Sequence, residues 1–255
     1  MTDRFEFAKA LGREAGALAQ RGFGQSAATL KGRHDVLTAM DAEVERFIRR
    51  AIAERFPGDA VIGEEEGGAT GDRLWIIDPI DGTANYARGI PHYCVSIGYL
   101  EHGVPTIGVI HDPPHDALYA ATLGRGAWRN DVRLAVSPCD DLGAATVECG
   151  WSTRRPAQAY VDLVGRVLAA GGAIRRAGSG ALGLVDVAAG RVEGYAELHI
   201  NAWDCAAGIV LVREAGGVTN DFFAGDGLRA GNPLIATNAA LCDKLAAVVG
   251  IPITR

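Results

Sequence analysis

The stretch Leu74–Tyr86, "LWIIDPIDGTANY", ends an apolar run with two aspartates three residues apart. The run itself predicts a buried strand, because it is rich in β-branched and aromatic residues and is followed by turn residues. Pro79 lacks an amide hydrogen and fixes φ at about −65°, so we expect it to end the strand ladder. Asp78 and Asp81 would then turn toward one point beyond the strand, where open α/β sheets bind ligands. Their spacing suits a shared cation.

The composition of the 255-residue chain is that of an ordinary globular protein, with 48% hydrophobic and 22% charged residues and a net charge of −6. A chain of this length needs neither metal nor disulfide merely to fold, so a metal site would point to chemistry. The acidic balance argues against a broad basic face, and we expect no membrane association and no direct nucleic-acid binding. The five cysteines contain no CxxC pair, and no signal peptide or run of 18 apolar residues is present, so we expect a cytoplasmic protein.

The order of patterns along the chain predicts an α/β layered fold. Helical spacing of apolar residues covers residues 3–21 and 41–55, and strand-like runs fill residues 60–136. The expected strands there are "AVIG", "LWIID", "CVSIGYL", "PTIGVIHD", "ALYAATLG", "GAWRN" and "VRLAVS", with a hairpin around Glu101–Gly103. After Ser137, strands alternate with helices again. We expect one unit, residues 1–255, with lobes of about 1–140 and about 141–255.

Oxygen ligands recur at the ends of the predicted strands. Glu64, Glu65 and Glu66 follow the strand "AVIG", and Asp204 opens the helix in "NAWDCAAGIVLVREAGG". Four or five carboxylates without thiolates describe a hard-cation site that favours Mg²⁺ over zinc. If "GTANYARG" begins a helix at Gly82, its first amides would face the metal site and could hold a phosphate group.

Each acidic residue also has a simpler reading. Asp81 or Asp204 alone could be helix N-caps, and Glu64 to Glu66 could be a solvated loop. Asp78 alone could be the partner of a structural arginine. The segment "RRAGSG", residues 175–180, could be a phosphate loop or a common glycine turn.

Taken together, "IGEE" (62–65), "WIIDPIDGTANY" (75–86) and "WDCAAGIVLVREAGG" (203–217) resemble the inositol monophosphatase family in content and order. The resemblance implies the αβαβα layered fold shared with fructose-1,6-bisphosphatase. It also implies a Mg²⁺-dependent, lithium-sensitive phosphatase that works as a homodimer on a small phosphate monoester.

The resemblance assigns roles to matching positions. The implied ligands of two or three Mg²⁺ ions are Glu64, Asp78, Asp81, Asp204 and the carbonyl of Ile80. The implied catalytic residues are Glu64, Glu65, Thr83 and Asp41. Asp41 would hydrogen-bond to Thr83, and these residues would activate the attacking water. The implied substrate-binding residues are Asp81, Gly82, Thr83, Gly178, Ser179, Gly180 and Glu197.

The resemblance favours an inositol-1-phosphatase. Histidinol-phosphatase is the nearest alternative, because Glu197 could bind an amine instead of hydroxyls. Fructose 1,6-bisphosphate and nucleotide 3′-phosphates are further substrates in the family, and some bacterial relatives bind the transcription machinery. The chain departs from the usual pattern at Ala84 and Tyr86, where threonine and phenylalanine are common, and at His199 and Asn201 near the substrate lobe.

Overall fold

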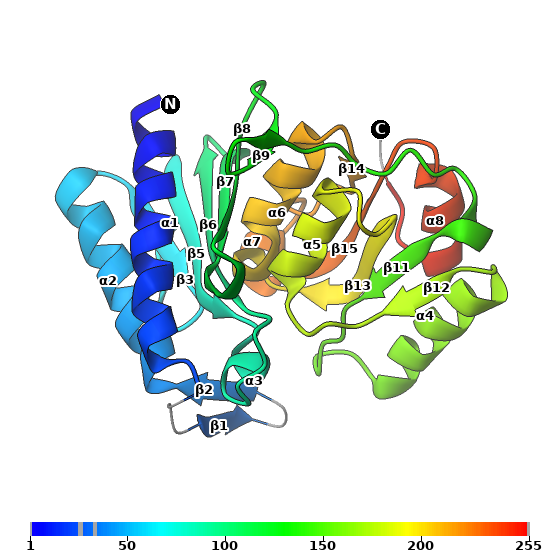
Figure 1. Cartoon of the computed structure of the whole chain (residues 1–255), viewed down its shortest axis with the longest axis horizontal. Coiled ribbons are helices and arrows are strands. Elements are labelled where there is room, and N and C mark those ends of the chain that lie inside the picture. The colour runs from blue at the N-terminus through cyan, green and yellow to red at the C-terminus, as the bar shows by residue number, and fades with distance from the viewer. Residues whose placement is uncertain (1, 25–27, 33–34, 254–255) are drawn as a thin grey trace.

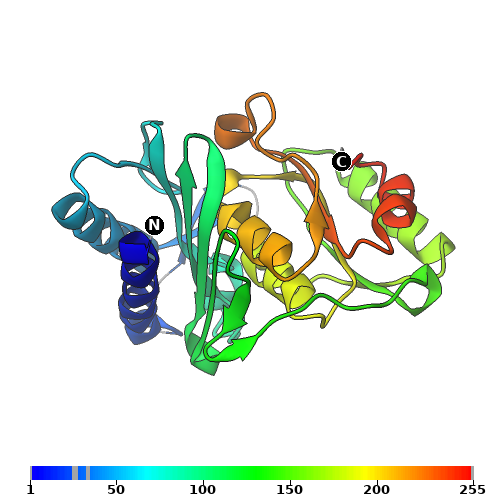
Figure 2. The same cartoon turned by 90° about the horizontal axis from the view of Figure 1, so that it is seen from above.

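Five alternating layers of helix and sheet make up the chain, and they succeed one another from left to right in Figure 1. The structure is a computed structural model that describes residues 2–24, 28–32 and 35–253. The same layers are seen from above in Figure 2. The expected αβαβα arrangement is therefore confirmed.

The first two layers are a pair of helices and the large sheet that they cover. Helices α1 (Thr2–Gly22) and α2 (Ala39–Arg55) pack on one face of an eight-stranded sheet. Its strands, in spatial order, are β10 (Val132–Arg133), β9 (Ala127–Arg129), β8 (Ala117–Thr122), β7 (Val104–Asp112), β6 (Cys94–Glu101), β5 (Arg73–Asp81), β3 (Ala60–Gly63) and β4 (Gly67–Gly68). Only β3 and β5 pair in parallel within it, as far as the described strands go. Both expected helices and the β6–β7 hairpin are confirmed.

The middle layer consists of α5 (Gly180–Ala188) and α6 (Ala202–Glu214), which lie between the two sheets. Gly98 of β6 lies opposite Gly108 of β7, and α6 packs over this pair. A Cβ atom added to Gly108 would lie 2.2 Å from the carbonyl oxygen of Ala207, so only glycine permits this approach. The close packing fixes α6, and with it Asp204, against the first sheet.

The second sheet and two outer helices complete the fold. The strand order is β12 (Ala173–Arg175), β11 (Thr146–Cys149), β13 (Gly194–Ile200), β15 (Asn232–Thr237) and β14 (Val218–Thr219). Helices α4 (Ala157–Ala169) and α8 (Cys242–Val249) pack on its outer face. The expected alternation after Ser137 is confirmed. One hydrophobic core joins residues of both sheets, for example Ile76, Val210 and Ala236.

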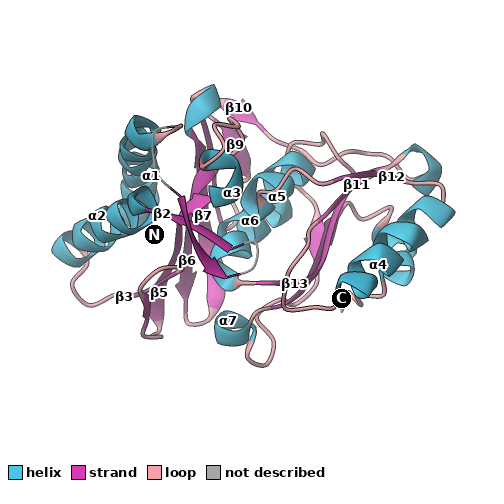
Figure 3. Cartoon of the chain, turned by 90° about the horizontal axis from the view of Figure 1, so that it is seen from below, coloured by secondary structure: helices cyan, strands magenta, loops and turns pink. Residues whose placement is uncertain are grey.

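Short elements fill the connections, and Figure 3 distinguishes them by type. They are the hairpin of β1 (Ala28–Gly32) and β2 (Asp35–Thr38), the helices α3 (Thr83–Tyr86) and α7 (Gly227–Ala230), and the 3₁₀ turns at Pro113–His115 and Leu142–Ala144. Tyr86 is fully buried, and its hydroxyl donates to the carbonyl of Ala19 at 2.7 Å. The phenol therefore anchors α3 to α1, which explains tyrosine in this place.

Two sequence expectations are wrong in detail. Strand β5 does not end at Asp78 but continues through Pro79 to Asp81. Asp78 lies opposite Ser96 and Asp81 opposite Cys94, so three steps on β5 face two on β6, and Pro79 falls inside this bulge, where no amide donor is required. The run "VRLAVS" forms a strand only at Val132–Arg133. Among the described residues no helix is long and apolar enough to cross a membrane.

Candidate functional site

Three carboxylates from different parts of the chain meet beside the first sheet. Glu64 follows β3, Asp78 lies within β5 and Asp204 lies in the first turn of α6. One oxygen from each lies within 4.8 Å of the others. The structure thus brings together three of the four carboxylates expected to hold a metal.

Local hydrogen bonds hold two of these carboxylates in place. Asp78 Oδ1 accepts the amide N–H of Ile80 at 3.0 Å, across the bulge of β5. Asp204 Oδ2 accepts the amide of Asn201 at 3.1 Å and its side-chain amide at 3.2 Å, which makes a capping box at the start of α6. Asp204 is thus the third residue of the helix and not its N-cap.

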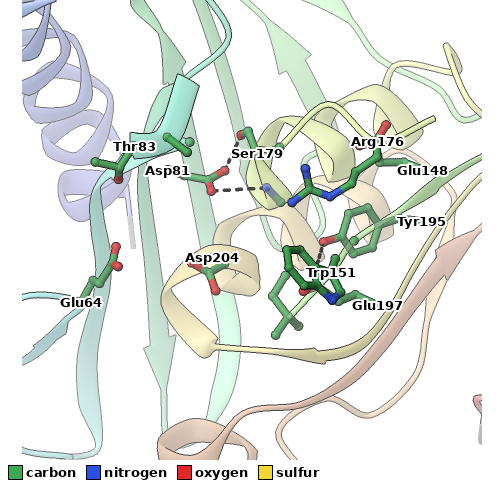
Figure 4. A pocket seen from close by; sticks show the side chains of 16 residues that line it. Glu64, Asp81, Thr83, Glu148, Trp151, Arg176, Ser179, Tyr195, Glu197 and Asp204 are labelled. Atoms are coloured by element: carbon green, nitrogen blue, oxygen red, sulfur yellow. Dashed lines mark hydrogen bonds between the residues drawn. The ribbon is translucent and has the colours of Figure 1, made fainter. Parts of the chain in front are cut away.

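The fourth carboxylate, Asp81, is turned toward α5. It accepts hydrogen bonds from the Ser179 hydroxyl and from the amide of Gly180 at 3.3 Å (Figure 4). A third comes from the amide of Ala181 at 2.7 Å. Asp81 therefore joins the bulged strand to the N-terminus of a helix about a hundred residues away, where the dipole favours negative charge. Asp81 lines the same cavity as Glu64 and Asp204 and lies close enough to raise the pKa of Asp78 and of Asp204, and its role as a metal ligand stays a prediction.

The electrostatics of the cluster fit a divalent cation. Burial, followed by repulsion from Glu64, Asp81 and Asp204, raises the pKa of Asp78 well above its ordinary value. Burial and the nearby Asp81 raise the pKa of Asp204 to about 7. Neither aspartate has an arginine or lysine partner in the described part of the chain. Acidic groups packed together in this way resist ionisation until a positive charge arrives, and all-oxygen donors match Mg²⁺.

Thr83 connects this cluster to Asp41. The Thr83 hydroxyl lies 3.1 Å from Asp41 Oδ1 and 2.8 Å from the carbonyl oxygen of Ile80. Asp41 is fully buried at the start of α2, where its other oxygen accepts the amide of Thr38 at 2.8 Å and the Thr38 hydroxyl at 2.6 Å. Burial raises the pKa of Asp41. The structure places Asp41 beside Thr83, where the resemblance put it. Gly82, with φ of 94°, makes the left-handed turn that starts α3.

Glu45 orients the turn that carries Glu64. Its fully buried carboxylate accepts the amide of Glu65 at 2.8 Å and that of Glu66 at 3.0 Å, and Arg49 donates to it at 2.8 Å. No sequence motif contains Glu45. A glutamate on the apolar face of a helix is unusual, however, because buried glutamates need a partner, and this could have marked it as a structural residue. It fixes Glu64 through the backbone of the next two residues.

A cavity of about 250 Å³ opens beside the carboxylates. Glu64, Asp81 and Thr83 line one side of it, and Glu197, Trp151 and Arg176 line the other (Figure 4). The expected substrate residues Gly178, Ser179, Gly180, Glu197 and Gly82 all line it. Its volume lies below the range of roughly 300–1,000 Å³ typical of drug-sized ligands, so a small polar ligand fits best.

Glu197 and Tyr195 form a buried pair on the substrate side. The Tyr195 hydroxyl donates to Glu197 Oε2 at 2.5 Å, and burial, as the largest cause, raises the pKa of Glu197 to about 8. His199 and Asn201, which the sequence placed near the substrate lobe, do not line the cavity. Instead His199 contacts the carbonyl of Ala230, and Asn201 caps α6. Arg176 lies in the segment 175–180 that the sequence marked as a possible phosphate loop, whereas Tyr195 and Trp151 lie in no motif and were not foreseen.

Known proteins are similar to this chain in both sequence and fold. The inositol monophosphatase family matches residues 1–250. A protein named Nus factor SuhB from Xylella fastidiosa is 42% identical over 203 residues, which is 78% of this chain and 74% of that protein. The extragenic suppressor protein suhB of Bartonella henselae has a solved structure with TM-score 0.89 and 33% identity, covering 97% of this chain and 98% of that one. An IMPase of Thermotoga maritima has TM-score 0.88 and 34% identity, covering 97% of each chain.

The αβαβα fold, with a carboxylate cluster beside a small polar cavity, defines a class of layered, phosphatase-type proteins. Within that class, the chain belongs to the inositol monophosphatase family.

Proposed function

We propose that this chain is a Mg²⁺-dependent phosphomonoesterase that hydrolyses a small phosphorylated polyol, with inositol 1-phosphate as the first candidate. The meeting of Glu64, Asp78 and Asp204 next to a polar cavity carries the proposal. Membership of the inositol monophosphatase family and the similarity to an IMPase of Thermotoga maritima support it.

The residues present fit the ion that the family implies. Glu64, Asp78 and Asp204 would hold Mg²⁺, together with Asp81 and the Ile80 carbonyl as further oxygen donors. When bound, two or three such ions would neutralise phosphoryl charge and make water a better nucleophile. Lithium inhibition is expected for the same site.

Thr83 and Asp41 would manage the proton of the attacking water. If the Thr83 hydroxyl donates to Asp41 Oδ1, its oxygen keeps lone pairs that can accept a proton from water. Asp41, whose pKa burial raises, is suited to hold that proton. The oxygen of water then bonds to phosphorus and the bond to the alcohol oxygen breaks. The alcohol oxygen takes up one proton from solvent, and Asp41 returns its proton to solvent, so the protons balance. Positioning supplies most of the catalysis in this kind of reaction.

The α5 terminus and Glu197 would bind the alcohol. Ser179 and Gly180 lie at the start of α5, and Glu197 lies across the cavity from them (Figure 4). A carboxylate that accepts from two neighbouring hydroxyls would favour a polyol. The Asp81 carboxylate lies between the metal side and this side and could contact both.

Phosphate release is the direct test. The panel contains inositol 1-phosphate, histidinol phosphate, fructose 1,6-bisphosphate and adenosine 3′,5′-bisphosphate, each with and without Mg²⁺. We expect Mg²⁺-dependent release of phosphate, with inositol 1-phosphate among the substrates, and a loss of at least about 100-fold in Asp78→Asn. Asp72→Asn, an exposed aspartate near the start of the same strand, is the matched control. Undiminished turnover by Asp78→Asn would refute the proposal.

A second candidate function is a binding role in transcription. Its basis is the name Nus factor carried by relatives that are 38–42% identical to this chain. The expectation of no direct nucleic-acid binding rests on net charge alone and does not address a protein-bound role. RNA polymerase retained by the inactive Asp78→Asn chain would support this role, and no retention at micromolar concentration would count against it. Sedimentation of the purified chain tests the expected homodimer.

A further inference from the structure

Two adjacent arginines after β12 have opposite environments. Arg175 ion-pairs with Asp186 and lies 3.4 Å from Glu148 Oε2, so it belongs to a structural network below α5. Arg176 has no carboxylate within ion-pair distance among the residues that the structure describes. Because neighbouring residues of an extended segment point to opposite sides, fixing Arg175 inward directs Arg176 into the cavity (Figure 4).

Trp151 holds the Arg176 guanidinium at the cavity wall. The guanidinium carbon lies 5.7 Å from the centroid of the Trp151 ring, within the range of a cation–π contact. The Trp151 ring in turn lies 6.4 Å from the ring of Tyr160 in α4. The stacked face leaves the edge of the guanidinium, with its N–H donors, available to a ligand.

Arg176 is the only lysine or arginine among the described residues that line the cavity. The opposite wall carries Glu64 and Asp204, which would hold the ions that in turn bind the reacting phosphate (Figure 4). A planar guanidinium without a carboxylate partner binds phosphate and carboxylate groups through paired hydrogen bonds. The cavity therefore has one cationic group on the side away from the reacting centre.

We propose that Arg176, backed by Trp151, is a specificity-determining residue that binds a second anionic group of the substrate, either a phosphate or a carboxylate. This inference rests on the proposed phosphatase function. It narrows the substrate class from any small phosphate monoester to those that carry a second phosphate or a carboxylate. It disfavours histidinol phosphate, since the guanidinium would repel an amine and one oxygen of Glu197 is already bonded to Tyr195.

Matched substrates isolate the second anionic group. 3-Phosphoglycerate differs from glycerol 3-phosphate by a carboxylate in place of a hydroxymethyl group, and fructose 1,6-bisphosphate differs from fructose 1-phosphate by a second phosphate. We expect the wild-type chain to prefer the member with two anionic groups in at least one pair. The pair that shows the preference identifies the group as carboxylate or phosphate.

The preference is measured as the kcat/KM for the substrate with two anionic groups divided by the kcat/KM for its matched partner. The variant Arg176→Met should lower this ratio about 10- to 100-fold, as expected for loss of hydrogen bonds to a charged group. Arg176→Lys should retain part of the ratio. Arg125→Met, which removes an exposed arginine from the turn after β8, is the matched control and should leave the ratio unchanged. Because Arg176 is exposed, melting temperatures should show that the variant folds.

An equal ratio in the wild type and Arg176→Met, or no preference in either pair, would overturn the inference. If the chain releases phosphate from none of the substrates, the phosphatase proposal fails separately. Calorimetric Kd values of the same pairs in the presence of Mg²⁺ then decide the role of Arg176. A Kd ratio that the variant does not change would refute it, and a ratio lowered about 10-fold or more would sustain it.

Discussion

The Tyr195 hydroxyl donates a hydrogen bond to Glu197 Oε2 at 2.5 Å, and both residues are buried on the wall of the cavity that faces the carboxylate cluster. Glu197 has no ion-pair partner within 4 Å in the described part of the chain, so this bond is the main restraint on its carboxylate. Tyr195 therefore acts as a positioning residue for Glu197.

Removing that hydroxyl should impair the binding of hydroxylated substrates. Tyr195→Phe is expected to raise KM for inositol 1-phosphate and to lower kcat/KM about 3- to 30-fold, because Glu197 loses its orienting donor. Turnover of 4-nitrophenyl phosphate, which has no hydroxyl for Glu197 to bind, should change little. Tyr160→Phe, which retains the ring beside Trp151, is the control. Equal losses on both substrates would contradict a positioning role.

The stability of the metal-free protein should depend on pH. The pKa of Asp204 is raised from 3.8 to about 7, so the folded state holds this proton more tightly than the unfolded chain. The stabilisation that the folded state gains from holding this proton is complete below about pH 4 and is lost as the pH rises through about 7. Urea unfolding in EDTA should give a falling free energy of unfolding between about pH 4 and pH 7.

Added Mg²⁺ should act most strongly at the upper end of that range. The ion competes with the protons of the cluster, and binding only to the folded state stabilises it by about 2.7 kcal/mol at a hundredfold excess over Kd. Equal stabilisation by Mg²⁺ at both ends of the range would argue against a metal held by these carboxylates.

Glu45 should affect the Mg²⁺ affinity of the site without contacting the ion, because it supports the turn that carries Glu64. In Glu45→Ala the amides of Glu65 and Glu66 lose their acceptor, and Glu64 loses its fixed position. The Mg²⁺ concentration for half-maximal activity should rise about 10-fold or more, as for other residues that orient metal ligands. Glu43→Ala, on the exposed face of the same helix, should leave it unchanged. An unaltered Mg²⁺ requirement in Glu45→Ala would refute the effect.

Features that depend on local sequence patterns could be predicted, and features that depend on contacts between distant segments could not. The helices and most strands followed from periodicity, and the carboxylates of the cluster followed from the ends of apolar runs. The bulge at Pro79 depends on the register with β6, which no local pattern encodes. The turn of Asp81 toward Ser179 and the fit of Arg176 against Trp151 likewise need segments far apart in the chain to meet.

Loss of one cluster carboxylate should separate stability from function. In Asp204→Asn the side-chain oxygen can still accept from the Asn201 amide, so α6 keeps its capping contact. Repulsion with Asp78 and Asp81 is removed, and the metal-free protein should melt a few degrees higher than the wild type at about pH 8. The rise in melting temperature on adding Mg²⁺ should shrink, and phosphate release should fall at least about 100-fold, because an oxygen ligand has lost its charge. Asp131→Asn, at an exposed position after β9, should show none of these changes. A lower melting temperature in EDTA together with a full response to Mg²⁺ would mean that Asp204 serves the fold and not the ion.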